Sequence, residues 1–259
     1  MKLEAVFRKP FLEQILFFRG KLKELIPTQK WNEVWKQQHD RAFMIAGAAK
    51  ADLLADLAKA VEKAIAEGKS IHDFRKEFDE IVAKHGWQGW RGEKTKTGRA
   101  WRTRIIYTTN ARVAYSAGRL AQLQNFEYWI YKHGNSEHPR LQHLAWDGLT
   151  LPKDHPFWRT HYPPNGFGCK CRVVGAGSLE TAKLLGSGEK TEPPKGWDTI
   201  DPKTKAPVGI DKGWDYMPGL STTETFRSLA DKIKKLPEPL RNALLKLWID
   251  KGLINPPQE

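Results

Sequence analysis

The segment from Ser70 to Gly86 carries the strongest structural signal in the chain, because its apolar residues recur every three or four positions. This spacing places them on one face of an α-helix. Ser70 and Asp73 have the spacing of a capping box, which starts a helix, and Gly86 is a typical helix-ending residue. The pattern therefore predicts one well-bounded helix.

The chain before Ser70 has the same helical character. Apolar residues from Phe11 to Leu25 form a stripe that Pro27 interrupts, and Thr28 has the character of an N-cap for a second helix. The run from Arg41 to Glu67 is rich in Ala and Leu, the composition of a strong helix former. We predict that residues 1–86 form a helical N-terminal domain.

The middle of the chain changes from helical to β-type patterns. A helix is predicted from Arg99 to Leu123, with Gly118 as a point of close packing. Segments 126–131 and 169–174 have the composition of short strands. The predicted fold class is α+β, a mostly helical N-terminal part followed by a small mixed module with long loops and a C-terminal helix. The predicted parts are a helical domain at 1–86, a linker at 87–98, the α+β module at 99–185, an extended surface loop at 186–219 and a C-terminal helical segment at 220–259.

Composition narrows the classes of protein to which the chain can belong. No apolar run approaches the roughly 20 residues that cross a bilayer, so we expect no membrane partner. The first residues lack the apolar stretch of a secretory signal, which favours a cytoplasm as the place of synthesis and work. The formal net charge of +13 attracts polyanions such as DNA at low salt.

The basic residues are concentrated between positions 91 and 119, where Glu93 is the only acidic residue. Tryptophan and tyrosine residues are interleaved with them, as in surfaces that stack on bases or in a core beneath a basic face. Two interpretations stay open, a solvated helix face or a surface that contacts phosphates. The candidate nucleic-acid-binding residues are Arg91, Lys94, Lys96, Arg99, Arg102, Arg104, Arg112 and Arg119.

A second cluster lies between His133 and Arg172, where five histidines and both cysteines of the chain occur. Thiolate and imidazole groups suit zinc, and Cys-x-Cys on a strand places both sulfurs on one face. The predicted ligands are Cys169, Cys171 and His161, with His143 as the fourth. Because four protein ligands leave no open position, the predicted role is structural. The alternative is that the cysteines are small packed residues and the histidines bond to loops.

The sequence contains no phosphate-binding loop, dinucleotide fingerprint, nucleophile elbow or His-Glu-x-x-His pair. We therefore expect a protein that is not an enzyme. The alternative is a metal-dependent nuclease or toxin-like enzyme, in which His143, Asp147 and His161 act with a metal ion on a phosphodiester bond. A DNA-binding module without a role in assembly is a third possibility.

Three motifs occur in a fixed order: RLQHLAWDG at 140–148, HPFW at 155–158 and YPPNGFGCKCRV at 162–173. Together they resemble the phage Mu F-like family of head-morphogenesis proteins. The residues that carry the resemblance are His143, Asp147, Gly148, Pro156, Phe157, Trp158, Pro163, Pro164, Asn165, Cys169, Cys171 and Arg172. Segment 105–119 is similar to a helix of the family, but Tyr107 stands before Thr108 where an arginine is expected.

The resemblance implies a minor capsid protein that acts at the portal vertex in head assembly and DNA packaging. Portal and capsid proteins would be its partners, with double-stranded DNA as a further one. It would reside in the virion, inside the capsid, after assembly in the host bacterial cytoplasm. No enzymatic activity and no cofactor other than zinc is expected.

Overall fold

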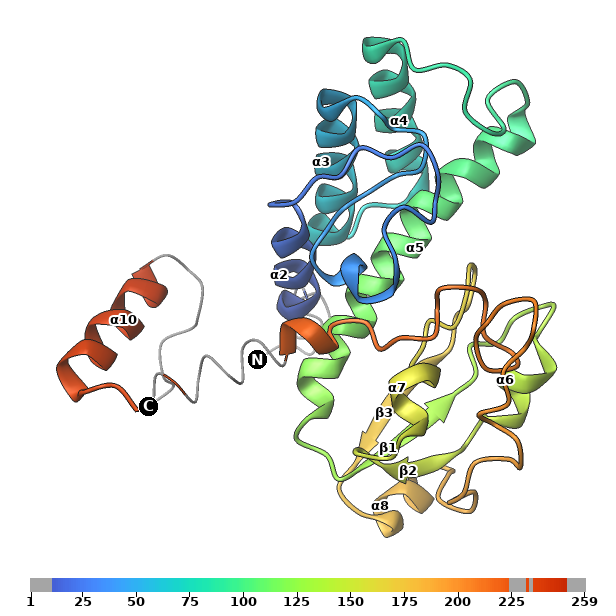
Figure 1. The fold of residues 1–259 in the computed structure, drawn as a ribbon, viewed down its shortest axis with the longest axis vertical. Helices are drawn as coiled ribbons and strands as arrows, with labels where there is room; N and C mark the ends of the chain where they lie inside the picture. The colour runs from blue at the N-terminus through green and yellow to red at the C-terminus, as the bar shows by residue number, and fades with distance from the viewer. Residues whose placement is uncertain (1–10, 224–231, 233–234, 251–259) are drawn as a thin grey trace, which may run out of the picture. The chain divides into compact units, whose positions relative to one another are not determined.

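The computed structural model describes residues 11–223, 232 and 235–250 (Figure 1). The chain divides into two compact units, the first ending at Leu220 and the second beginning at Ser221. The first unit contains both the helical part and the sheet, including residues 87–98, which the sequence patterns assign to a linker. All of the candidate site residues lie in the first unit.

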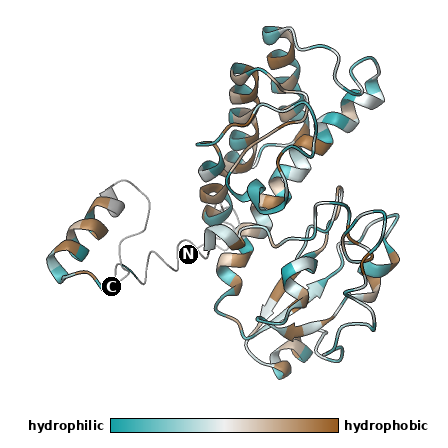
Figure 2. Ribbon diagram, in the orientation of Figure 1, coloured by the Kyte–Doolittle hydropathy of each residue, from teal (hydrophilic) through white to brown (hydrophobic). Residues whose placement is uncertain are grey.

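The N-terminal part of the first unit is helical. Its helices are α2 (Leu12–Lys21), the 3-10 helix η1 (Lys36–Asp40), α3 (Ala51–Glu67), α4 (Ile71–His85) and α5 (Lys96–Leu123). Helix α3 buries a leucine-rich face, and hydrophobic and hydrophilic residues both occur along its length in Figure 2. This amphipathic pattern drives packing of the helix on the core.

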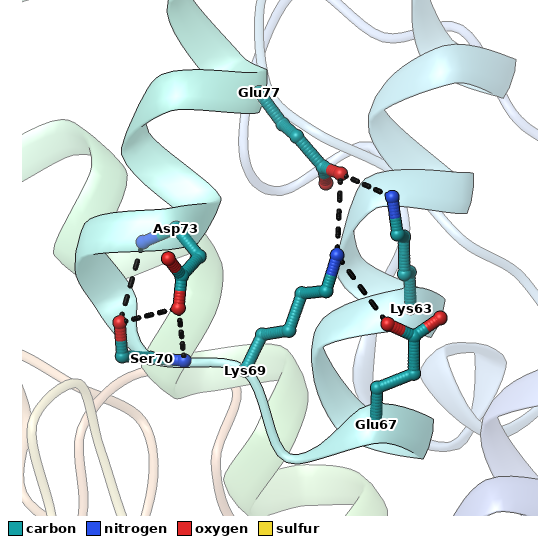
Figure 3. Close-up of polar contacts among 6 residues, drawn as sticks. All are labelled: Lys63, Glu67, Lys69, Ser70, Asp73 and Glu77. Atoms are coloured by element: carbon teal, nitrogen blue, oxygen red, sulfur yellow. Dashed lines mark hydrogen bonds and ion pairs between the residues drawn. The ribbon is translucent and has the colours of Figure 1, made fainter.

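The connection between α3 and α4 follows the sequence signals closely. Gly68 ends α3 with a left-handed φ of 65°, and the Ser70 hydroxyl accepts a hydrogen bond from the Asp73 backbone. Figure 3 shows this cap beside ion pairs that join the two helices, in which Glu77 accepts from Lys63 at 2.7 Å and lies 3.7 Å from Lys69. The prediction of a helix bounded by Ser70 and Gly86 is confirmed.

Two helical expectations in the N-terminal part are wrong. No helix begins at Thr28, and the Ala- and Leu-rich run becomes helical only at Ala51. Residues 24–26 instead pair with Phe43 through two backbone hydrogen bonds, Ile26 N to Phe43 O at 3.0 Å and Phe43 N to Glu24 O at 2.9 Å. This pairing keeps the backbone extended and buries Phe43 completely, so tertiary packing overrides local helix propensity.

Helix α5 is the longest element, and α2 packs directly against it. The Gln14 side chain donates to the Ala111 carbonyl at 3.0 Å. A Cβ atom added to Gly118 would lie 2.7 Å from the Gln14 backbone nitrogen. The prediction that Gly118 is a point of close packing is therefore confirmed.

The second half of the first unit contains a small antiparallel sheet, as the α+β prediction requires. Its strands are β1 (Tyr128–Lys132), β2 (Thr150–Pro152) and β3 (Arg172–Ala176), in the order β2-β1-β3. The short helices of this module are α6 (Leu141–Ala145), α7 (Phe157–His161) and α8 (Leu179–Leu184). One continuous apolar core includes residues from α3, α5, β1 and α7.

Residues 186–219 contain no named helix or strand, but they are not simply a surface excursion. Ala206, Ile210, Trp214, Tyr216 and Met217 are buried. Apolar side chains placed between the prolines and glycines anchor this segment on the module. The segment predicted as an extended surface loop thus has these five side chains in the protein interior.

In the second unit, helix α10 spans Glu238–Asp250. This helix lies within the C-terminal helical segment predicted at 220–259, of which residues 224–231, 233–234 and 251–259 lie outside the described part of the chain. None of the described helices has both the length and the apolar character needed to cross a membrane.

Candidate functional site

His143, Cys169 and Cys171 converge in the interior of the module. His143 lies on α6, and the two cysteines lie immediately before β3. The exposed fractions of the three residues are 3%, 6% and 8%. The His143 Nδ1 atom lies 3.8 Å from Cys169 Sγ and 3.5 Å from Cys171 Sγ. All three donor atoms lie within 4.8 Å of one another.

The loop that follows the module fixes the orientation of the His143 ring. The Nε2 atom lies 2.9 Å from the backbone carbonyl oxygen of Gly209, and the ring stacks on Trp146 with 5.0 Å between centroids. Gly209 has a φ of 96°, and a Cβ atom there would lie 2.7 Å from the Gln142 side chain. Glycine is therefore required at the position that presents this carbonyl.

Polar side chains surround the cluster. The buried Tyr131 hydroxyl donates to Asn165 Oδ1 at 2.9 Å, and burial raises the Tyr131 pKa. Arg112 donates to the Cys169 carbonyl at 3.0 Å. A hydrogen bond shared by the two thiols lowers the pKa of Cys169 and raises that of Cys171.

His161, the third of the predicted zinc ligands, lies outside this group. It is fully buried, and its Nδ1 atom lies 2.8 Å from the Thr160 hydroxyl. Its ring contacts Trp146, the same indole on which His143 stacks. The structure therefore brings together three of the four predicted ligands, because His161 is held among aromatic rings instead.

The arrangement expected for a nuclease is not formed by the described residues. The Asp147 carboxylate accepts a hydrogen bond from the His133 backbone at 2.7 Å. This bond joins the two ends of the connection between β1 and β2, which contains α6. Within the described part of the chain, only His143, Cys169 and Cys171 form a group of metal-ligating side chains with converging donor atoms. No observation on these residues favours hydrolysis.

The eight candidate nucleic-acid-binding residues separate into two sets. Arg99, Arg102, Arg112 and Arg119 are partly buried and bond to the protein itself. For example, Arg99 pairs with Asp79 at 2.5 Å, and Arg102 donates to the Ala46 carbonyl. The other four are exposed and have no ion pair among the described contacts: Arg91, Lys94, Lys96 and Arg104. We call these four the exposed basic set.

Part of the exposed basic set borders a cavity of about 780 Å³ beside α5. Arg91 lies over the Trp101 ring at 5.6 Å, and both residues line the cavity. None of the described lining residues is acidic. The six tryptophans in its wall are Trp31, Trp35, Trp87, Trp90, Trp101 and Trp214.

Sequence reasoning missed the parts of the site that come from distant loops. Gly209 holds His143 from 66 positions away along the chain, and no local signal marks it. The role of Trp146 as a shared aromatic neighbour of two histidines was also unexpected. The sequence motif gives Asn165 no structural role, but this residue is fully buried and bonds to Tyr131 beside the cluster.

Comparison with known proteins places this module in a family. Residues 55–174 match the family model described as "Phage Mu protein F like protein". The chain is 31% identical to "Putative capsid assembly protein F" of Escherichia phage Mu, over 96% of this chain and 62% of that protein. It is 34% identical to "Mu-like prophage FluMu F protein" of Haemophilus influenzae, over 80% of this chain and 49% of that protein.

The chain thus spans between about half and two thirds of the length of these two curated relatives. No solved structure matches it significantly. The family match covers α4, α5, the strand β1 and the whole His143, Cys169 and Cys171 cluster. The resemblance expected from the three motifs is confirmed, and the chain belongs to the phage Mu F-like protein family.

Proposed function

We propose that this chain is a minor head-morphogenesis protein, which acts at the portal vertex during capsid assembly and DNA packaging. The observation that carries the proposal is its 31% identity, over 96% of its length, to a protein named as a putative capsid assembly protein. The proposed partners are portal and capsid proteins, and the proposed location is the capsid interior after assembly in the host cytoplasm.

Complementation tests this proposal. A phage that lacks the gene should produce heads with reduced DNA content, and the intact gene supplied in trans should restore packaged DNA and titre. Normal DNA-filled heads from the deletion phage would refute a role in head morphogenesis. Cross-linking in assembling lysates should recover portal protein with this chain, and recovery of capsid protein alone would place its action away from the portal.

We further propose that the exposed basic set contacts double-stranded DNA. These four cations are free of ion pairs among the described contacts, so phosphates can reach them without breaking a protein bond. The partly buried arginines bond to the protein instead: Arg102 donates to the Ala46 carbonyl and Arg112 donates to the Cys169 carbonyl. Each phosphate neutralised releases condensed counterions, so four contacts give a slope of log K against log salt of roughly −3.6.

The test replaces Arg91, Lys94, Lys96 and Arg104 together by Gln and measures DNA affinity over a range of salt concentrations. We expect weaker DNA binding, and a slope of log K against log salt that is less negative by about three to four. The matched control makes the same charge change at four other exposed positions, Arg41, Lys50, Lys59 and Lys76. Equal losses in the two variants would show that net charge alone, and not this surface, attracts DNA.

A further inference from the structure

We propose that His143, Cys169 and Cys171 hold one zinc ion through three protein ligands and that the predicted fourth ligand, His161, takes no part. This inference is independent of the proposed role in head assembly. It rests on the geometry of the donor atoms, the orientation of the imidazole and the charge balance of a buried site.

The donor spacing is that of a tetrahedral zinc site. Zinc binds sulfur at about 2.3 Å and imidazole nitrogen at about 2.0–2.1 Å, so the two donors stand about 3.6 Å apart at a tetrahedral angle. The observed nitrogen–sulfur separations are 3.5 Å for Cys171 and 3.8 Å for Cys169. An ion can therefore bind all three atoms with little movement of the chain.

The imidazole is oriented as a ligand. The Gly209 carbonyl can only accept a hydrogen bond, so the Nε2 atom at 2.9 Å carries the proton. In neutral His143 the unprotonated atom is then Nδ1, the atom that faces the two sulfurs. Histidines that bind metals commonly donate their other N–H group to a backbone carbonyl in this way.

Zinc also explains how this group of atoms can be buried. Two thiolates and one divalent ion have a net charge of zero, which reduces the cost of removing them from water. Without an ion, the single lone pair of Nδ1 can accept a proton from only one of Cys169 and Cys171. A zinc ion binds both sulfurs at once and so leaves neither without a partner.

The fourth coordination position falls to a water molecule in this proposal. The His161 Nδ1 atom lies 2.8 Å from the Thr160 hydroxyl and its Nε2 atom has no hydrogen-bond partner among the described residues, but the donor atoms that converge are those of His143, Cys169 and Cys171 alone in the described part of the chain. The buried Nδ2 atom of Asn165 has no partner among the described residues, as expected beside a site that also holds an ordered water. Because all three ligands are buried, the ion would tie α6 to the residues just before β3 rather than meet a substrate.

The test measures zinc by elemental analysis in the full chain, purified under reducing conditions. We expect one zinc per chain in the wild type and at least about a tenfold loss in Cys169→Ser, Cys171→Ser and His143→Gln. The matched control is His161→Gln, which should retain zinc. A wild type without stoichiometric zinc would overturn the proposal, and so would equal zinc loss in His143→Gln and His161→Gln.

A second measurement covers the case in which a ligand variant fails to fold. Wild-type protein stripped with a chelator is titrated with Co²⁺ alone. We expect thiolate-to-cobalt charge-transfer absorption that saturates at one ion per chain and disappears when Zn²⁺ is added. Absence of the charge-transfer band in folded protein would refute coordination by the cysteines.

Discussion

Gly209→Ala tests how the loop after the module controls the site. The backbone at this position has a φ of 96°, which costs a residue with a Cβ atom roughly 1–2 kcal/mol. The added Cβ would also lie 2.7 Å from the Gln142 Cβ and 3.0 Å from the Trp146 ring, and overpacking of this kind costs about 1–3 kcal/mol. We expect a combined loss of unfolding free energy of about 2–5 kcal/mol.

Urea unfolding followed by circular dichroism measures this loss, and thermal unfolding should show a Tm lower by about 4–20 °C. Displacement of the Gly209 carbonyl also removes the partner of His143 Nε2, so zinc affinity should fall about 10–100-fold. The matched control is Gly177→Ala, where a Cβ atom meets nothing within 4 Å. If the two variants had equal stability, the argument that this loop orients the imidazole would be wrong.

Three further predictions concern the helical part. Gly118→Val forces α2 away from α5 and should cost about 1–3 kcal/mol in urea unfolding, whereas Gly20→Ala, with nothing within 4 Å, should cost nothing. Ser70→Ala removes the N-cap of α4 and should lower the free energy of unfolding by about 1 kcal/mol. An unchanged urea midpoint would show that the cap does not stabilise the protein. Burial, and then the charge of Lys21, lowers the pKa of His39 to about 4, so its contribution to stability is complete above about pH 6.5 and is lost as pH falls toward 4. His39→Gln should remove this part of the pH dependence, and an identical pH profile would contradict it.

The sequence predicts the elements whose signals are local. Helix α4 has its cap, its apolar spacing and its terminal glycine within one continuous segment, so its bounds could be read directly. Gly118 could be recognised because a glycine inside a long helix usually marks close packing. Cys-x-Cys is a local pattern, so the sequence predicts that the two cysteines act as a pair.

The remaining features depend on contacts between distant parts of the chain. Phe43 stays in extended backbone because it pairs with residues near Ile26, and that pairing is invisible to helix propensity. His161 looks like a ligand from residue type alone, yet α7 directs it toward Trp146 and Thr160. The carbonyl of Gly209 reaches His143 only through the fold.

A minor head-morphogenesis protein, as proposed for this chain, is expected inside the phage head in few copies. Quantitative mass spectrometry of purified, DNA-filled particles tests it most directly, with portal protein as the internal standard. We predict that the chain is present in particles at a copy number far below that of the major capsid protein. Its absence from particles and from their assembly intermediates would refute the proposed role in the phage head.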